Sequence, residues 1–166
     1  MMALTLGLGK SQVDENYLSE LDQTMRASDL DMTIFFRELA KVSFRDQPKE
    51  AKKHIDAAFY GAISEENTVM WIQWFEKYLM KLKDSPISQE DRTIQMNAVN
   101  PKYVLRNYMA QTAIDQAEKG EYNLIYELYN LLKNPYDEQP DQEIWYKKRP
   151  NWARNKVGCS ALSCSS

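Results

Sequence analysis

The stretch that decides the fold runs from Glu65 to Lys83 and reads EENTVMWIQWFEKYLMKLK. Apolar side chains recur along it at helical spacing and together form one broad arc. The members of this arc are Met70, Trp71, Trp74, Phe75, Tyr78, Leu79 and Leu82. An arc of this width packs against more than one neighbouring element. We therefore predict a long helix at the centre of an all-α core.

Three shorter helices are predicted before this central one. Asp14 and Asp31 each stand where a side chain caps the start of a helix, and the first of these helices should end near Ser28. The apolar stripe of the second helix consists of Phe35, Leu39 and Val42. Pro48 suits the first turn of a third helix. We predict that this third helix ends at Gly61, because a residue without Cβ readily turns left-handed.

Two further helices are predicted after the central one. Ser88 opens a helix that reaches Val99. Asn100 is a good N-cap, and proline is tolerated at the first helical position, because its missing N–H would have no partner inside the helix. The next helix is therefore predicted over Pro101–Lys119, with Gly120 at its end.

The last strong helix is predicted over 122–132 and is closed by Asn134-Pro135, since a residue before proline avoids the α region. Its short connection to the preceding helix makes the two antiparallel. One short helix is predicted around Gln142 to Lys147. About six or seven helices should form an irregular bundle over 1–150, and 151–166 should form a flexible tail that contains the cysteines.

Composition excludes several classes of function. Hydrophobic residues make up 43% of the 166, enough to build a core, and only five are glycine, which suits helices. Twenty-four acidic residues against twenty-one basic ones give a net charge of -3, so we expect no nucleic-acid partner. No apolar run approaches the ~20 residues that cross a bilayer, so we expect no membrane partner and a soluble, intracellular protein.

Two sequence features resemble sites without meeting their requirements. Gly7-Leu8-Gly9-Lys10-Ser11 ends like a phosphate-binding loop, but the first glycine of that motif is replaced by Leu4 and no strand precedes it. We interpret it as a connector between helices. His54 is the single histidine, and no partners at ligand spacing accompany it, so we interpret it as a surface or boundary residue.

A third candidate is a group of polar residues that follows the helix ending at Val99. Its members are Asn100, Lys102, Arg106 and Asn107. They could form a polar site, but a structural interpretation is favoured. In that interpretation Arg106 anchors backbone carbonyls or a carboxylate such as Asp137 or Glu138. The aromatic residues of the central helix are likewise interpreted as core or interface.

Several motifs in one order resemble the C-terminal part of the selenoprotein O family. They are Met2-Ala3-Leu4-Thr5-Leu6-Gly7-Leu8, Thr33-Ile34-Phe35-Phe36-Arg37-Glu38-Leu39, Asn100 to Gln111, Gly120-Glu121-Tyr122 and Asn134 to Pro140. Thr5 replaces the lysine that the family has there. The resemblance covers almost the whole chain and is looser between Val42 and Gln95.

This resemblance implies a larger parent protein with a kinase-like fold. The parent would bind ATP with Mg²⁺ in an inverted pose and transfer AMP to Ser, Thr or Tyr hydroxyls of protein substrates. It would act in the cytoplasm of a bacterium, or in mitochondria in eukaryotic relatives. The residues for that chemistry lie outside this chain, so no catalytic, cofactor-binding or metal-binding residue is assigned here. The N-terminal kinase-like domain is then the expected partner.

The chain end carries the one reactive group that the resemblance points to. Family members have cysteine or selenocysteine third from the end, where Cys164 stands, and in bacterial relatives that cysteine can pair with one in the catalytic domain. Cys159 is a weaker redox candidate, because the family's local pair would need cysteine at position 161, which is Ala161.

Two hypotheses follow. The leading one is a helical C-terminal fragment of a protein adenylyltransferase, inactive alone and able to self-associate through an apolar patch. The alternative is a freestanding interaction module whose Trp-rich central helix binds a partner helix.

Overall fold

The computed structural model describes residues 2–156, and its regular elements in that range are helices, which confirms the predicted all-α fold. The α-helices are α1 Met2–Thr5, α2 Glu15–Arg26, α3 Met32–Leu39, α4 Pro48–His54, α5 Glu65–Lys83, α6 Gln89–Val99, α7 Asn107–Ala117 and α8 Asn123–Leu131. The 3-10 helices are η1 Lys10–Gln12, η2 Asp56–Ala58, η3 Pro140–Trp145 and η4 Asn151–Arg154. The chain divides into two compact units, one up to Asn100 and one from Pro101 onward.

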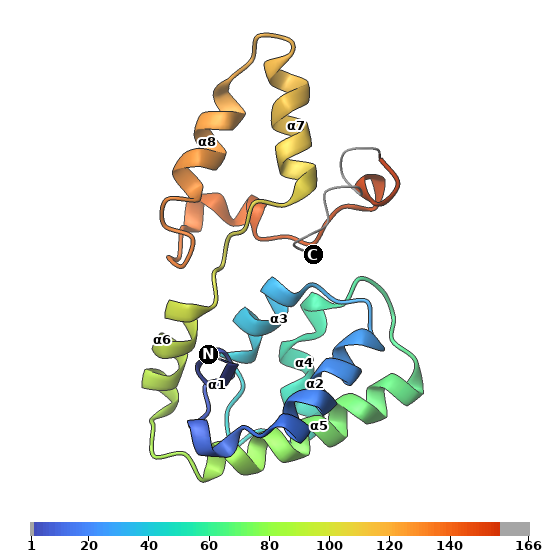
Figure 1. Cartoon of the computed structure of the whole chain (residues 1–166), viewed down its shortest axis with the longest axis vertical. Helices are drawn as coiled ribbons and strands as arrows, with labels where there is room; N and C mark the ends of the chain where they lie inside the picture. The colour runs from blue at the N-terminus through green and yellow to red at the C-terminus, as the bar shows by residue number, and fades with distance from the viewer. Residues whose placement is uncertain (1, 157–166) are drawn as a thin grey trace. The chain divides into compact units, whose positions relative to one another are not determined.

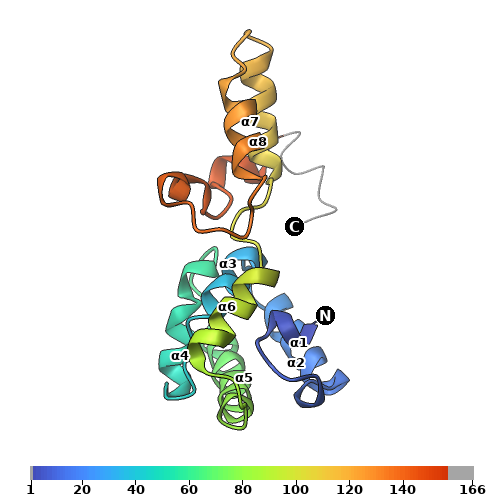
Figure 2. The ribbon, with the colours of Figure 1, turned by 90° about the vertical axis from the view of Figure 1, so that its left-hand side faces the viewer.

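The first unit is built on α5, whose bounds are those that the sequence predicts. This helix packs against α2 and α4, and Figures 1 and 2 show it running along the base of the unit. Trp71, Phe75 and Tyr78 are fully buried along it, and Trp74 stacks on Tyr78 with ring centroids 5.0 Å apart. The aromatic arc of the central helix is therefore core.

Local capping explains where most helices of the first unit begin. The side chains of Asp14, Asp31 and Ser88 accept hydrogen bonds from the backbone N–H three residues later, at 2.8, 3.1 and 3.0 Å. Ser64 does the same for α5 at 3.1 Å. Each bond satisfies an amide that has no partner inside its helix. The predicted starts of α2, α3 and α6 are confirmed.

The predicted end of the third helix is wrong. α4 ends at His54, and the chain passes through the 3-10 turn η2 to Phe59, which pairs with Leu30 in an isolated antiparallel bridge. The Phe59 ring then lies 5.7 Å from that of Trp71. Gly61 has no left-handed conformation, so no glycine cap ends this element.

The helix predicted over Pro101–Lys119 begins six residues later than expected. Asn100 is the C-cap of α6 rather than an N-cap, and its N–H donates to the Met96 carbonyl at 2.9 Å. The N–H groups of Lys102 and Tyr103 both donate to the Pro135 carbonyl, at 2.8 and 3.0 Å, which keeps this stretch out of a helix. α7 ends at Ala117, two residues before the predicted Lys119, and Gly120 follows in a left-handed conformation at φ +84°.

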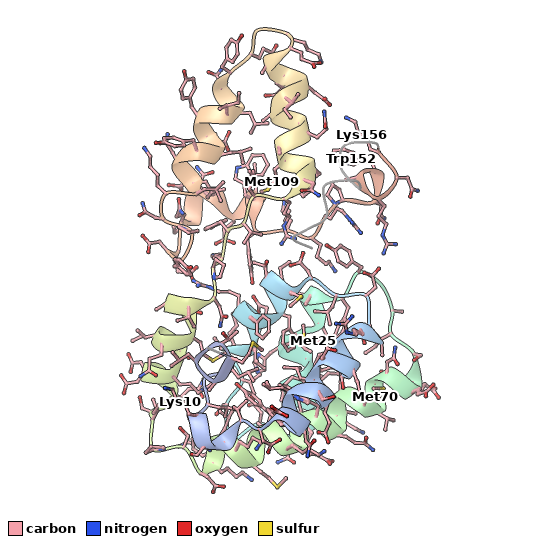
Figure 3. All side chains as sticks on the ribbon, viewed as in Figure 1. Lys10, Met25, Met70, Met109, Trp152 and Lys156 are labelled. Carbon is pink, nitrogen blue, oxygen red and sulfur yellow. The ribbon has the colours of Figure 1, made fainter. Side chains whose placement is uncertain are left out.

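The second unit is an antiparallel hairpin of α7 and α8 with a small core (Figure 1). The buried members of this core are Tyr103, Met109, Ala113, Leu124, Leu128 and Leu131. Met109 lies at the base of the hairpin (Figure 3). The short helix predicted near 142–147 is the 3-10 helix η3, and Trp145 and Tyr146 pack on the core.

The segment predicted as a tail begins with η4, which contains Trp152 (Figure 3). The ring of Trp152 meets that of Tyr108 edge-on, with centroids 6.2 Å apart. Lys156 Nζ lies 5.5 Å from the centroid of the Trp152 ring. Cys159 and Cys164 lie outside the described residues. Within residues 2–156, no helix is both long and apolar enough to cross a bilayer.

Candidate functional site

Of the polar residues that the sequence singles out after Val99, Asn100 and Lys102 are structural anchors, whereas Arg106 and Asn107 stand at the start of α7. The first anchor surrounds the end of α6. Arg37 of α3 donates from NH1 to the carbonyls of Asn97 and Asn100, at 3.0 and 2.9 Å. The Asn100 side chain donates from Nδ2 to the Thr5 carbonyl at 2.9 Å. These bonds satisfy carbonyls at the ends of α6 and α1, where no further helical turn supplies N–H donors.

The second anchor is Arg92, which sequence reasoning missed. Its NH2 donates to the carbonyls of Ala40 and Val42, and its NH1 donates to the Tyr78 hydroxyl at 2.9 Å. That hydroxyl in turn donates to the Leu6 carbonyl at 2.8 Å. Burial raises the pKa of Tyr78 to about 12, although the Arg92 guanidinium acts in the opposite direction.

Nothing in the local sequence identifies Arg92 as buried, because it is one polar residue in a polar helix. Arg37 stands within the Thr33 to Leu39 motif that carries the family resemblance, and that motif was the available signal. Arg37 is 4% exposed and Arg92 is 2% exposed. They act on backbone carbonyls, which assigns them to holding the fold.

The third anchor is Lys102 in the second unit. Its Nζ donates to Glu138 Oε2 at 2.5 Å and also to Glu143 Oε1, and it lies 5.2 Å from the centroid of the Tyr146 ring. The Lys102 side chain is 7% exposed. Glu138 is one of the carboxylates that the sequence analysis offered to Arg106, and Lys102 pairs with it.

The protonation of Lys102 decides what it can do chemically. Burial disfavours its charged form, but the hydrogen bonds to Glu138 and Glu143 outweigh burial, and the pKa of Lys102 is raised. A lysine that acts as a nucleophile or a general base needs a lowered pKa instead. Lys102 is therefore a fixed cation that ties the 138–143 segment to the start of the second unit.

In the loop that ends like a phosphate-binding motif, the three amides from Gly7 to Gly9 are already engaged. The N–H groups of Gly7 and Leu8 donate to the Leu4 and Ala3 carbonyls, at 3.0 and 2.9 Å. The Gly9 N–H donates to Gln12 Oε1 at 2.8 Å. A phosphate cradle needs such groups pointing outward. The loop is a connector between α1 and α2, as the sequence analysis interpreted it.

Two further places carry side chains that could bind a ligand, His54 and a groove between α2 and α5. His54 is partly exposed and lies 3.3 Å from the Asp46 carboxylate, and the described residues contain no cluster of three or more metal-ligating side chains. The groove between α2 and α5 contains Lys77 and Lys81, but both are engaged. Lys77 pairs with Glu20 at 2.7 Å, and Lys81 donates to the Gln12 carbonyl at 2.5 Å.

Comparisons with known proteins show which family this chain resembles. The family model described as "Protein adenylyltransferase SelO" matches residues 1–133. A protein of Flavobacterium johnsoniae named "Protein nucleotidyltransferase YdiU" is 49% identical over 97% of this chain and 31% of its own length. Proteins of the same name from Rhodopirellula baltica and Aromatoleum aromaticum are 43% and 41% identical over the whole chain and 33% and 32% of theirs. The chain spans about a third of the length of these relatives.

Proposed function

This chain belongs to the SelO family of protein adenylyltransferases, and from that membership we propose that it is the helical C-terminal part of an enzyme that transfers AMP from ATP to Ser, Thr or Tyr hydroxyls of proteins. The observation that carries the proposal is the family match over residues 1–133, which includes the Arg37, Arg92 and Lys102 anchors. The relatives named above are bacterial, and in a bacterium we expect the enzyme to act in the cytoplasm.

The role that we assign to this chain within the enzyme is that of a scaffold. Members of the family use ATP and Mg²⁺, and the described residues do not fit either group. The amides of the Gly7 to Gly9 loop are engaged, and no three metal-ligating side chains lie together in the described part of the chain. We therefore place ATP, Mg²⁺ and the protein substrate on the remaining two thirds of the longer polypeptide.

The alternative of a freestanding module depends on the aromatic face of α5. That face would have to be accessible in order to bind a partner helix. Trp71 is 0% exposed and Trp74 is 2% exposed. The rings of Phe35 and Phe59 pack on Trp71, and the ring of Tyr17 stacks on Trp74. The aromatic face is therefore buried and cannot bind a partner helix, so the adenylyltransferase proposal is favoured.

Calorimetry and a transfer assay test the proposal. The isolated chain should show no saturable binding of Mg²⁺·ATP and should transfer no labelled AMP to a protein acceptor. A chimera in which this chain replaces the matching third of the Flavobacterium johnsoniae relative should bind Mg²⁺·ATP and should transfer AMP. Stoichiometric ATP binding by the isolated chain would contradict the scaffold role, and an inactive but folded chimera would contradict the enzyme assignment.

Cys164 supports a second, separate proposal. We propose that oxidation joins its thiol to a cysteine of the catalytic part, so that the tail becomes a redox-dependent latch. Two thiols lose two protons and two electrons to form one disulfide, and a peroxide oxidant takes them up and becomes water. AMP transfer by the chimera should then differ between reducing and oxidising conditions. Cys164→Ser should abolish that difference, whereas Cys159→Ser should leave it intact, and equal activity in all cases would reject the latch.

A further inference from the structure

Helix α8 has two apolar faces, and only one of them is covered within the described residues. Its first face, formed by Leu124, Leu128 and Leu131, is buried in the core of the second unit. On the opposite side lie Tyr122, Ile125, Tyr126 and Tyr129, which we call the tyrosine stripe. Their spacing of three and four residues places them in one row along the helix.

The tyrosine stripe is unusually exposed for such large side chains. Its members are 54%, 42%, 66% and 61% exposed, in chain order. Lys133 ends the row, with its Nζ 4.4 Å from the centroid of the Tyr129 ring. A helix that is apolar on both sides is normally covered on both sides. The stripe therefore indicates a contact surface.

The size of the stripe separates the possible occupants. An aromatic side chain buries about 150–250 Å² when it is fully covered, so the exposed fractions of the stripe amount to roughly 400 Å² of accessible surface. A stable complex between separate molecules needs about 800 Å² on each partner, so a dimer through the stripe alone would be too small. A contact within one polypeptide needs less area, because joining its two parts costs no loss of free translation.

We propose that the tyrosine stripe packs against the part of the longer polypeptide that the relatives possess and this sequence lacks. The length of the relatives supports this choice, because about two thirds of their chain lies outside the region matched here. Tyrosine rather than leucine in the row indicates an occupant that is apolar at its centre and offers hydrogen-bond acceptors at its rim. The inference rests on the proposed function, since it takes this chain to be one part of a longer enzyme.

Nitration of tyrosine by tetranitromethane, read out by peptide mass spectrometry, tests the inference. In the isolated chain, Tyr126 and Tyr129 should react rapidly at every protein concentration. In the Flavobacterium chimera they should react about tenfold more slowly, because the occupant excludes the reagent. Both proteins unfolded in urea serve as the control and should react equally.

Substitutions give an independent measurement. The double variant Tyr126→Lys with Tyr129→Lys should leave the melting temperature of the isolated chain within about 2 °C, because both side chains are exposed there. The same double variant should lower the melting temperature of the chimera by several degrees. Met80→Lys, which replaces an exposed apolar residue of α5, is the matched control and should lower neither.

The outcomes separate this inference from the proposed function. Protected tyrosines in a chimera that transfers no AMP would support the contact and count against the enzyme assignment. Equal nitration in an active chimera would overturn the contact and leave the enzyme assignment standing. If the chimera does not fold, the isolated chain decides: a stable dimer with protected tyrosines overturns the inference in favour of a second copy, and a monomer with reactive tyrosines supports it.

Discussion

Two buried tyrosines of the first unit differ in what surrounds their hydroxyl groups. The Tyr78 hydroxyl donates to the Leu6 carbonyl and accepts from Arg92, so both of its capacities are used. The Tyr17 hydroxyl is buried and has no hydrogen-bond partner among the described residues. Burial raises the pKa of Tyr17, and the nearby Tyr78 and Glu20 raise it further. The tyrosine hydroxyl should therefore stabilise the fold at position 78 and destabilise it at position 17.

Removing each hydroxyl should change stability in opposite directions. Tyr17→Phe removes an unsatisfied buried group and should raise the free energy of unfolding by about 1 kcal/mol. Tyr78→Phe removes two hydrogen bonds of a buried network and should lower it by about 1–3 kcal/mol. Urea unfolding followed by tryptophan fluorescence measures both. A Tyr17→Phe variant as destabilised as Tyr78→Phe would show that the first hydroxyl has a partner.

The pKa of Tyr78 predicts a loss of stability in alkali. Its folded pKa is about 12, against an ordinary value of 10.0, so the neutral hydroxyl is favoured in the fold. Stability from this group is complete below pH 10 and declines as pH rises toward 12, because the unfolded chain releases its proton first. Between pH 10 and 12 the wild type should lose about 2 kcal/mol more than Tyr78→Phe, measured by unfolding at each pH. Parallel pH profiles would contradict this assignment.

At the scale of elements, the contact between α1 and α6 depends on Gly7. This glycine has φ +64°, and an added Cβ would lie 2.5 Å from Met96 Sδ and 2.9 Å from Arg92 Cγ. A larger residue would thus be strained in its backbone and would push α6 away from α1. The close approach brings the Leu6 carbonyl to Tyr78, so one glycine supports the whole Arg92 anchor.

A set of three glycine substitutions separates these effects. Gly7→Ala should lower the free energy of unfolding by about 2–4 kcal/mol, from strain and overpacking together. At Gly120 an added Cβ would meet open space, but φ is +84°. Gly120→Ala should therefore lower the free energy of unfolding by about 1 kcal/mol, from backbone strain alone. Gly61→Ala has open space and no left-handed φ, so it should be nearly neutral. Equal effects of all three in thermal unfolding would refute this account.

At the scale of the whole molecule, the two units differ in the cores that hold them. The first unit buries the aromatic arc of α5 together with side chains of α2, α3 and α4. The second unit begins at Pro101 and has a core of six buried side chains. A core of that size is marginal for a domain standing alone. This agrees with the proposal that the second unit gains further cover in the longer enzyme.

Hydrogen exchange should report this difference directly. Amides of α7 and α8 should exchange at least tenfold faster than those of α5, because opening the smaller core costs less free energy. In the chimera the protection of α8 should rise while that of α5 stays the same. Uniform protection across both units in the isolated chain would show that they unfold as one body.

The sequence by itself determined the features that depend on neighbouring residues. The caps of α2, α3 and α6 each join a side chain to an amide three residues away, so the pattern that predicts them contains all of their atoms. The arc of α5 and the left-handed Gly120 belong to the same class. The family resemblance, later matched by the family model over residues 1–133, came from motifs in a fixed order.

Tertiary structure alone decided the features whose partners are distant in the chain. The stretch that follows Asn100 has helix-start residues but does not form a helix there, because the Pro135 carbonyl accepts hydrogen bonds from the amides of Lys102 and Tyr103. Arg92 looks like one polar residue of an exposed helix, and its burial depends on carbonyls about fifty residues away. Local preferences amount to a fraction of a kcal/mol for each residue, whereas a buried polar group without a partner costs several times more. The fold therefore follows the distant partner wherever the two conflict.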